Sequence, residues 1–272
     1  MLEEYFFHMR HYIELVTKSK DVHSLFLLGS AGIGKTHSTI AKLKELKADY
    51  VYMNGNISPL ALYEFLYTQN GRVIVFDDTQ GLIRSKNSIA LLLGALWSPE
   101  EKRLISWNTT SKILENIPSQ FEFTGKIIFI MNEVPKNVDF QTLISRCFFF
   151  KVDFDHKTLL DMMCQIAKFP EVFKHIKAQT SPGTKHFDLR LLKKLETIYQ
   201  YDKEHWKLLS RPFLEVDKEK EIVAQLIASG LAGKKAVREF KRQTGLSQRT
   251  YYRIKNEVNL NEKIQVQKNQ AN

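Results

Sequence analysis

The sequence predicts an α/β protein in which a parallel β-sheet has helices on both faces and is followed by wholly helical segments. Two observations predict this fold. Short, unbroken apolar runs such as 25–28, 73–76 and 127–130 are typical of strands buried inside a parallel sheet. Stretches with apolar residues at helical spacing lie between these runs, and beyond residue 155 only the helical spacing remains.

Length and composition set the outer limits. The 272 residues, 43% hydrophobic and 26% charged, suffice for one α/β domain and one or two small ones. No apolar run is as long as a membrane span and no cleavable signal is apparent, so we expect no membrane partner and a cytoplasmic location, in a nucleoid or at a viral replication site. Cys147 and Cys164 are too few for a disulfide framework or a zinc site. The net charge of +10 and a pI near 9.4 indicate a polyanionic partner, although only weakly by themselves.

The predicted elements follow one another in a regular order. An apolar stripe predicts a helix over residues 2–18 that packs on the edge of the sheet. A helix over 57–68 begins at Ser58-Pro59, where proline is tolerated. The other predicted elements of this part are strands at 22–28, 50–53, 72–76, 126–131 and 147–152, helices at 36–47 and 88–97, and a short helix that closes at 143–146.

The first strand leads into the pattern Gly-x-x-x-x-Gly-Lys-Thr. The glycines let the backbone turn so tightly that successive N–H groups point at one anion, and the following helix adds its N-terminal dipole. Lys35 can reach the β- and γ-phosphates of a nucleotide, and the Thr36 hydroxyl can ligate Mg²⁺. The sequence therefore predicts a site for ATP and Mg²⁺ formed by Gly29, Ser30, Ala31, Gly32, Ile33, Gly34, Lys35 and Thr36.

Two later strands end in polar side chains, at the edge where open α/β sheets bind ligands. Asp77 and Asp78 follow the run 73–76, and Asn132 follows the run 127–131. We expect Asp77 to hold Mg²⁺ through water and Asp78 to orient and deprotonate the attacking water. Asn132 can hydrogen-bond the γ-phosphate or that water from the side opposite Asp78.

These motifs carry a family resemblance. The stretches Gly29–Thr36, Val73–Asp78, Ile127–Asn132 and Ser145-Arg146 resemble, in this order, those of the AAA+ ATPases, over roughly residues 15–200. The resemblance implies an α/β P-loop AAA+ domain at 1–154 with a five-stranded parallel sheet, a helical lid at 155–204, and assembly into a ring or filament.

The same resemblance implies roles for three polar side chains. Asn132 corresponds to sensor 1. Arg146 corresponds to the arginine finger, which reaches the γ-phosphate bound by the neighbouring subunit. Arg190, in the segment 186–190, corresponds to sensor 2 and would contact the nucleotide of its own subunit, although a lid-surface arginine paired with a carboxylate is nearly as well supported.

The chain departs from the family pattern in two places. AAA+ proteins usually have Asp-Glu where this chain has Asp77-Asp78, so we expect hydrolysis that is slow or needs an assembled ring; Asp-Asp does occur in superfamily-3 viral helicases. Residues 103–123 look like a hairpin inserted before the sensor 1 strand. In such helicases and in some initiators this hairpin contacts DNA in the central pore. Lys112 near its tip would then contact DNA, and a surface hairpin without this role is equally well supported.

The C-terminal part predicts a helix-turn-helix module at 217–258, after a linker at 205–216 and before a disordered tail at 259–272. Helices at 217–228, 234–244 and 248–258 are separated by glycine-containing turns. Phe240, Leu246, Tyr251 and Ile254 are expected to be buried. The outward face of the third helix offers side chains that read base edges or hold phosphates: Gln248, Arg249, Tyr252, Arg253 and Asn256.

Charge favours DNA binding by this module over a protein-docking role. Residues 231–258 contain eight basic and two acidic residues, which leaves a net charge of +6, most of the +10 of the chain. An AAA+ domain followed by a helix-turn-helix resembles replication initiators of the DnaA and Orc/Cdc6 types. The small size is similar to relatives encoded by viruses, plasmids or transposons.

The sequence thus predicts an ATPase that assembles as a homo-oligomer on duplex DNA, with single-stranded DNA as a second candidate partner, and remodels the DNA in replication initiation of a mobile element. Three alternatives stay open. One is a superfamily-3-like helicase. Another is a regulator of transposition or helicase loading that engages a transposase or a helicase. The third is a transcription switch that binds ATP without hydrolysing it.

Overall fold

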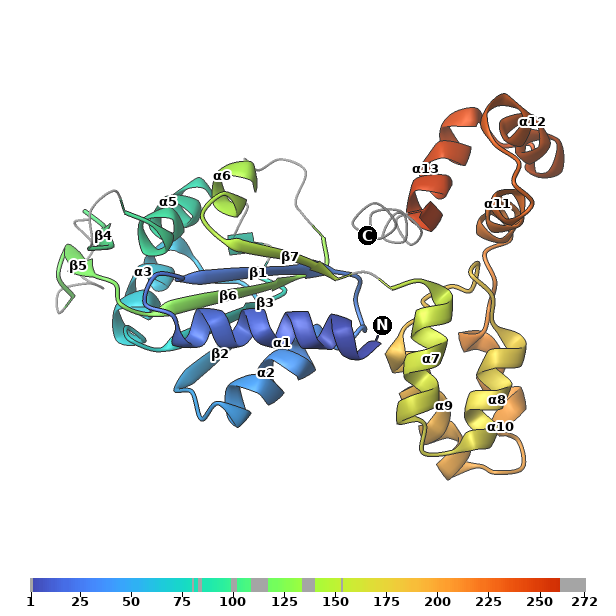
Figure 1. The fold of residues 1–272 in the computed structure, drawn as a ribbon, viewed down its shortest axis with the longest axis horizontal. Helices are drawn as coiled ribbons and strands as arrows, with labels where there is room; N and C mark the ends of the chain where they lie inside the picture. Colours follow the sequence, from blue (N-terminus) through green and yellow to red (C-terminus); the bar gives the residue numbers. More distant parts are fainter. Residues whose placement is uncertain are drawn as a thin grey trace. The chain divides into compact units, whose positions relative to one another are not determined.

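A parallel β-sheet organises the first of two compact units, Met1–Val152 and Asp153–Asn272, into which the chain divides (Figure 1). The structure is a computed structural model that describes residues 2–79, 81–82, 85–98, 102–108, 117–133, 140–152 and 154–259. Among the helices of these residues, none is long and apolar enough to cross a membrane.

The sheet of the first unit has five parallel strands in the order β2-β3-β6-β1-β7. Because all strands are parallel, their carboxyl ends meet at one edge of the sheet, where functional side chains can gather. The predicted five-stranded parallel sheet is therefore confirmed. The strands are β1 (Ser24–Gly29), β2 (Tyr50–Asn54), β3 (Val73–Asp77), β6 (Lys126–Met131) and β7 (Phe148–Val152).

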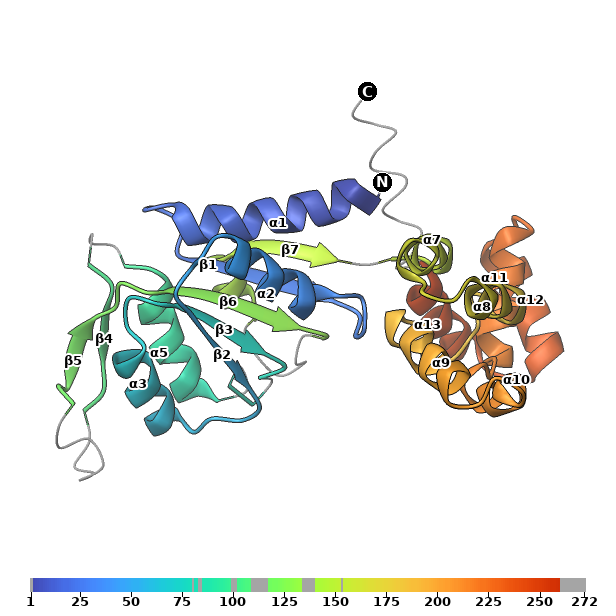
Figure 2. The same ribbon diagram turned by 90° about the horizontal axis from the view of Figure 1, so that it is seen from below.

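Helices cover both faces of this sheet (Figures 1 and 2). On one face α1 (Leu2–Lys18) packs against α2 (Lys35–Glu45), the helix that follows β1. On the other face lie α3 (Pro59–Thr68) and α5 (Lys86–Leu96), together with the short helix α6 (Phe140–Ile144). Each of α3 and α5 begins at a serine whose side chain accepts a hydrogen bond from a backbone N–H of the first turn.

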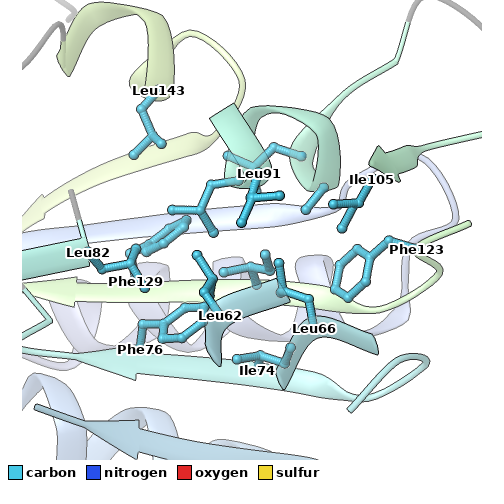
Figure 3. Close-up of a cluster of buried hydrophobic side chains, with 14 of the residues drawn as sticks. Leu62, Leu66, Ile74, Phe76, Leu82, Leu91, Ile105, Phe123, Phe129 and Leu143 are labelled. Atoms are coloured by element: carbon cyan, nitrogen blue, oxygen red, sulfur yellow. The ribbon is translucent and has the colours of Figure 1, made fainter. Parts of the chain in front are cut away.

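The main core lies between the sheet and the helices α3 and α5 (Figure 3). Three phenylalanines of adjacent strands stack across the sheet, with ring centroids 5.5 Å apart for Phe26 and Phe129 and 5.8 Å apart for Phe76 and Phe129. Leu62 and Leu66 of α3 and the leucines of α5 close over these rings. The unbroken apolar runs of the sequence therefore become strands that are buried on both sides.

The hairpin predicted for residues 103–123 is confirmed, and its base belongs to the core. Strands β4 (Leu104–Ser106) and β5 (Gln120–Glu122) pair antiparallel, as Figure 2 shows. The guanidinium of Arg103 is buried and donates to the carbonyls of Ala95 and Gly125, at 2.7 and 3.0 Å. Burial lowers the pKa of Arg103 to about 10, which leaves it charged at neutral pH. Lys112, the predicted DNA contact of this hairpin, lies outside the described residues.

The second unit begins with a helical subdomain at the position predicted for the lid, and we call this subdomain the lid. Its helices are α7 (His156–Ile166), α8 (Pro170–Gln179), α9 (Leu189–Tyr201) and α10 (Trp206–Ser210), and a 3₁₀ turn at Arg211–Phe213 follows. Their buried faces share one core of Met163, Val172, Ile176, Leu191, Leu192, Leu195 and Trp206.

The linker predicted at 205–216 is corrected by this arrangement. Trp206 is buried in the lid core, so the first half of the segment is a helix of the lid and not a free connection. Pro212 does not break the chain because it occupies the first turn of the 3₁₀ helix, where a proline needs no N–H partner. Helix α8 was not expected either, and its Pro170 likewise lies at the start of a helix.

Three further helices, α11 (Lys218–Ala228), α12 (Gly233–Thr244) and α13 (Gln248–Asn259), agree with the predicted positions. Their core consists of Val223, Leu226, Ala236, Phe240, Tyr251 and Ile254, with Leu246 partly buried against it. Gly245 ends α12 with φ of 71°, a left-handed conformation that favours glycine. We call these three helices the C-terminal module; residues 260–272 lie outside the described part.

The lid and the C-terminal module are joined by backbone pairing. Thr184 and Val216 form an antiparallel bridge, and the N–H of Asp217 donates to the carbonyl of Gly183 at 2.8 Å. The Ser181 hydroxyl adds a short hydrogen bond to the Glu221 carboxylate in the first turn of α11. The start of the module is therefore fastened to the loop between α8 and α9.

Candidate nucleotide-binding site

The glycine-rich loop connects the carboxyl end of β1 to the start of α2. Gly29 stands where β1 and β7 end side by side, and a Cβ atom there would lie 2.0 Å from the carbonyl oxygen of Val152. Gly34, the residue before α2, has φ of 90°. Both positions thus require glycine, and the loop presents the free N–H groups of the helix start to any anion bound there.

Lys35 extends back over this loop. Its side chain is buried, and Nζ donates to the carbonyl oxygens of Gly29 and Ser30 at 2.8 and 2.7 Å and to Oδ1 of Asn132 at 3.0 Å. The ammonium group therefore lies between the loop and the end of β6. It is placed to exchange these neutral acceptors for phosphate oxygens, which bind a cation more strongly.

Thr36 and Asp77, the two predicted metal ligands, are in direct contact. The Thr36 hydroxyl donates to Oδ2 of Asp77 at 2.8 Å, and Asp77 is buried at the end of β3. Hard oxygen donors of this kind suit Mg²⁺, which takes one or two protein ligands and fills its other positions with water and phosphate. Among the described residues, no group of three or more His, Cys, Asp or Glu side chains is placed to hold a metal ion.

Asp78 has a left-handed backbone, with φ of 52°, and an exposed side chain. Aspartate and asparagine tolerate this conformation better than longer residues do, which gives a structural reason for aspartate at this position. Its Oδ1 accepts a hydrogen bond of 2.6 Å from Nδ2 of Asn132. The amide of Asn132 therefore links Lys35 to Asp78, and its predicted contact with the γ-phosphate or the attacking water remains a prediction.

Arg146 lies at the opposite end of the sheet from the glycine-rich loop, where the parallel strands begin. The residue precedes β7, and its carbonyl accepts a hydrogen bond from Ser24, the first residue of β1. The six residues of β1, roughly 20 Å of strand, separate it from the glycine-rich loop. Its Nη1 donates to the carbonyl of Leu93 at 2.8 Å, and its guanidinium carbon lies 5.2 Å from the ring centroid of Trp97. Arg146 therefore cannot contact a nucleotide in its own subunit.

The other predicted contacts belong to the second unit. Arg190 is exposed in the first turn of α9, whose N-cap Asp188 accepts its backbone N–H. The five predicted DNA-reading residues of α13, namely Gln248, Arg249, Tyr252, Arg253 and Asn256, are all exposed, while Tyr251 and Ile254 of the same helix are buried. The roles of these residues remain predictions.

One polar residue of the site was missed from the sequence. Tyr52 lies near the end of β2, and its hydroxyl donates to Oδ2 of Asp77 at 2.8 Å. The parallel pairing of β2 with β3 places these strand ends together. The sequence did contain a signal for Tyr52, because it is a side chain with a polar group near the carboxyl end of a predicted strand. Asp77 and Asn132 were identified from polar side chains at the ends of predicted strands.

Comparisons with known proteins agree with this fold. No family model matches the chain. An uncharacterized 36.7 kDa protein from the nrdC-mobD intergenic region of Enterobacteria phage T4 is 34% identical over 143 residues, which cover 46% of this chain and only 43% of that protein. The structure of a mutant of Thermotoga maritima RuvB aligns with a TM-score of 0.52 and 17% identity, over 91% of this chain and 83% of RuvB.

Another structure of the same protein, the RuvB Holliday junction branch migration motor, aligns with a TM-score of 0.51 and 16% identity over 95% of this chain and 86% of RuvB. The replication initiator DnaA bound to AMPPCP and single-stranded DNA aligns with a TM-score of 0.48 and 14% identity, over 84% and 71% of the two chains. Sheet order, glycine-rich loop and likeness to RuvB define the class: the chain has the fold of an AAA+ ATPase, a P-loop α/β domain followed by a helical region.

Proposed function

We propose that this protein is an ATPase that binds ATP and Mg²⁺ at the carboxyl edge of the sheet, hydrolyses ATP between subunits, and binds DNA through its C-terminal module. The observation that supports ATP binding and hydrolysis best is the convergence of five side chains. Lys35, Thr36, Asp77, Asp78 and Asn132 come from three separate segments of the chain and form two sets of hydrogen bonds at the carboxyl ends of the strands, Lys35–Asn132–Asp78 and Thr36–Asp77.

Each of these side chains has a separate task in the proposed reaction. Lys35 leaves the loop carbonyls and binds the β- and γ-phosphates. Asp78 accepts the proton of the attacking water, and Asn132 keeps its carboxylate aimed. Thr36 and Asp77 hold Mg²⁺, which when bound neutralises charge on the phosphate oxygens.

Arg146 supplies the reason to propose a homo-oligomer, either a ring or a filament. Its distance from the glycine-rich loop of its own chain leaves a neighbouring subunit as the place where it can stabilise transition-state charge. In this proposal the guanidinium exchanges Leu93 and Trp97 for the neighbour's γ-phosphate. Arg190 of the lid is proposed to contact the nucleotide bound by its own subunit.

The proposed partner is duplex DNA. The C-terminal module exposes the polar face of α13 and carries most of the chain's net positive charge. RuvB, which shares the fold, is described as a Holliday junction branch migration motor, and this favours DNA as the partner. The phage origin of the T4 relative agrees with the proposed role, assembly on DNA in replication initiation of a virus, plasmid or other mobile element.

Three alternatives to an initiator make different predictions. A helicase or branch-migration motor, which the hairpin and the likeness to RuvB favour, would displace a strand from a forked or branched substrate. A transposition or helicase-loading regulator would retain a transposase or a helicase only in the presence of ATP. A non-hydrolysing switch would change its DNA affinity with ATP but show no turnover.

The proposal is tested by measuring ATP hydrolysis of the purified chain, with and without duplex DNA, beside Lys35→Ala and Arg146→Ala. We expect DNA to stimulate the wild type and both variants to be inactive alone. A mixture of the two variants should recover part of the activity, because the Lys35→Ala subunit still supplies Arg146 to the intact pocket of its neighbour. Arg10→Ala, an arginine of α1 paired with Glu45, is the control and should hydrolyse normally.

Two results would contradict the proposal in different ways. If Arg146→Ala hydrolyses ATP as fast as the wild type, the shared site and the proposed oligomer are both wrong. If the wild type binds ATP but never hydrolyses it, even with DNA, the non-hydrolysing switch replaces the ATPase.

A further inference from the structure

Two hydroxyl groups meet on one carboxylate oxygen at the end of β3. Oδ2 of Asp77 accepts a hydrogen bond of 2.8 Å from Thr36 and another of 2.8 Å from Tyr52. The amide of Asn54 donates in turn to the Tyr52 hydroxyl at 3.3 Å. The carboxylate of a predicted metal ligand is thus fixed by the phosphate-loop helix on one side and by the edge strand β2 on the other.

The register of the sheet places Tyr52 there. In the parallel pair of β2 and β3, Asn54 lies opposite Asp77 and Tyr52 lies opposite Val75. Side chains alternate along a strand, so Tyr52, Asn54 and Asp77 share the face on which α2 presents Thr36. The side chain of Tyr52 extends from β2 towards β3, where its hydroxyl reaches the Asp77 carboxylate.

The contact is not explained by a need to bury the tyrosine. Tyr52 is 42% exposed, so its hydroxyl could bond to water at little cost. A tyrosine hydroxyl is protonated at neutral pH and can therefore donate to the carboxylate. A neutral donor fixes the orientation of a carboxylate without adding a positive charge that would repel a cation.

We propose that Tyr52 is a positioning residue of the metal site, whose hydroxyl holds the Asp77 carboxylate in the orientation in which Asp77 and Thr36 bind Mg²⁺ together. This inference rests on the proposed nucleotide site. Outer-shell partners of metal ligands change metal affinity by about tenfold or more when they are removed. Tyr52 therefore governs the Mg²⁺ concentration that the site needs and leaves the affinity for nucleotide alone unchanged.

The test compares Tyr52→Phe, which removes only the hydroxyl, with Tyr50→Phe. Tyr50 precedes it by two residues on the same face of β2, and its hydroxyl makes no hydrogen bond within the described part of the chain. A fluorescent ATP analogue is titrated into each full-length protein in EDTA and then at increasing Mg²⁺. Binding of Mn²⁺ in the presence of ADP, followed by electron paramagnetic resonance, gives the metal affinity directly.

We expect Tyr52→Phe to bind the analogue normally in EDTA, to need about ten times more Mg²⁺ for half-saturation, and to bind Mn²⁺ about tenfold more weakly. Excess Mg²⁺ should restore its ATP turnover, which would not happen if the substitution merely disordered β2. Tyr50→Phe should match the wild type in all three measurements.

Failure of this inference and failure of the proposed function give different results. If Lys35→Ala loses the analogue and Tyr52→Phe has the metal dependence of the wild type, Tyr52 has no positioning role although the nucleotide site is real. If the wild type and Lys35→Ala bind the analogue equally weakly at every Mg²⁺ concentration, the nucleotide site itself is wrong.

Discussion

The left-handed backbone at position 78 favours a short side chain, such as aspartate, for the carboxylate that is proposed to accept a proton from the attacking water. The φ of 52° at Asp78 and its 2.6 Å hydrogen bond from Asn132 fit a carboxylate on a single methylene. We expect Asp78→Glu, although AAA+ ATPases usually have glutamate here, to lower ATP turnover, because the longer side chain pushes its carboxylate past Asn132. The left-handed backbone also disfavours it by up to about 1 kcal/mol. Steady-state hydrolysis and urea unfolding measure the two effects.

The matched control for that substitution is Asp78→Asn, which tolerates the same backbone but cannot accept a proton. It should retain ATP binding and lose hydrolysis by roughly a hundredfold or more. Faster turnover in Asp78→Glu than in the wild type would show that the backbone adapts and that the shorter side chain limits the rate.

Tyr251 has a buried hydroxyl that lacks a hydrogen-bond partner in the described part of the chain. The residue is fully buried between the helices of the C-terminal module, next to Phe240. We expect Tyr251→Phe to stabilise the module by about 1–2 kcal/mol, since it removes an unsatisfied polar group and keeps the ring. Thermal unfolding measures this change. Tyr252→Phe, on the exposed side of the same helix, should shift it by less than about 0.5 kcal/mol. A loss of stability in Tyr251→Phe would mean that the hydroxyl has a water partner.

Among the elements, α1 and α2 are joined by an ion-pair network centred on Lys42. Its Nζ lies 2.8 Å from Glu14 and 2.9 Å from Glu45, and Glu14 also pairs with Lys18. Hydrogen bonds from Lys18 and Lys42 lower the pKa of Glu14 from 4.5 to about 2. A lowered carboxyl pKa gives stability that is complete above the unfolded value of 4.5 and disappears as the pH falls towards 2.

We therefore expect Lys42→Met to destabilise the first unit at neutral pH, and the difference from the wild type to shrink as the pH falls below 4.5. Added salt should shrink it as well, because these charges are near the surface. Urea unfolding at several pH values measures the difference. Lys44→Met changes an exposed lysine of the same helix and should show neither dependence. A difference that persists undiminished towards pH 2 would assign the effect to packing of the lysine stem.

The elements also show how far the sequence can predict this protein. The strands and the helices α11 to α13 were predicted because their apolar periodicity is strong and glycines or caps mark their ends. Helix α10 was missed because it has only five residues and because Pro212, which follows it, was taken as a break but occupies the first turn of a 3₁₀ helix. Helix α8, which begins at Pro170, was not predicted either. The hydrogen bonds of Tyr52 and Asn132 could not be predicted, because the register of neighbouring strands decides which polar side chains at the strand ends come into contact.

At the scale of the whole molecule, net positive charge is concentrated in the C-terminal module. The proposed DNA binding would combine contacts to phosphates, which are independent of sequence, with contacts to bases, which are specific. Lys235 of α12 and Arg249, in the first turn of α13, are both exposed. In the proposed complex with DNA, Lys235 would bind phosphate and Arg249 would read bases. We expect Lys235→Ala to weaken all duplexes alike and to reduce the slope of log affinity against log salt by about one. Arg249→Ala should instead reduce the preference among sequences. Binding titrations at several salt concentrations on selected and random duplexes measure both, and equal losses in both variants would indicate non-specific binding.

In the proposed ATPase, the junction between the lid and the C-terminal module is the place where nucleotide binding would be coupled to DNA binding. Gly183 packs against the first turn of α11, and a Cβ atom there would lie 2.9 Å from the backbone nitrogen of Glu221. A larger residue must therefore separate α11 from the loop and break the bond from Asp217 to the Gly183 carbonyl. In the proposed ATPase, a lid that responds to ATP moves the module with it only while this junction holds. We expect Gly183→Val to bind DNA and ATP separately like the wild type but to lose the effect of each on the affinity for the other, which must be equal in both directions.

Fluorescence anisotropy of labelled duplex, with and without ATP, measures this coupling. The control is Gln179→Val, an exposed position at the end of α8 that leaves the junction intact and should keep the wild-type coupling. If Gly183→Val retains the coupling in full, communication between nucleotide and DNA does not pass through the junction and must depend on assembly of the subunits. In that case Arg146→Ala, which binds ATP but cannot complete the site of its neighbour, should abolish the coupling. If the coupling passes through the junction alone, Arg146→Ala should retain it.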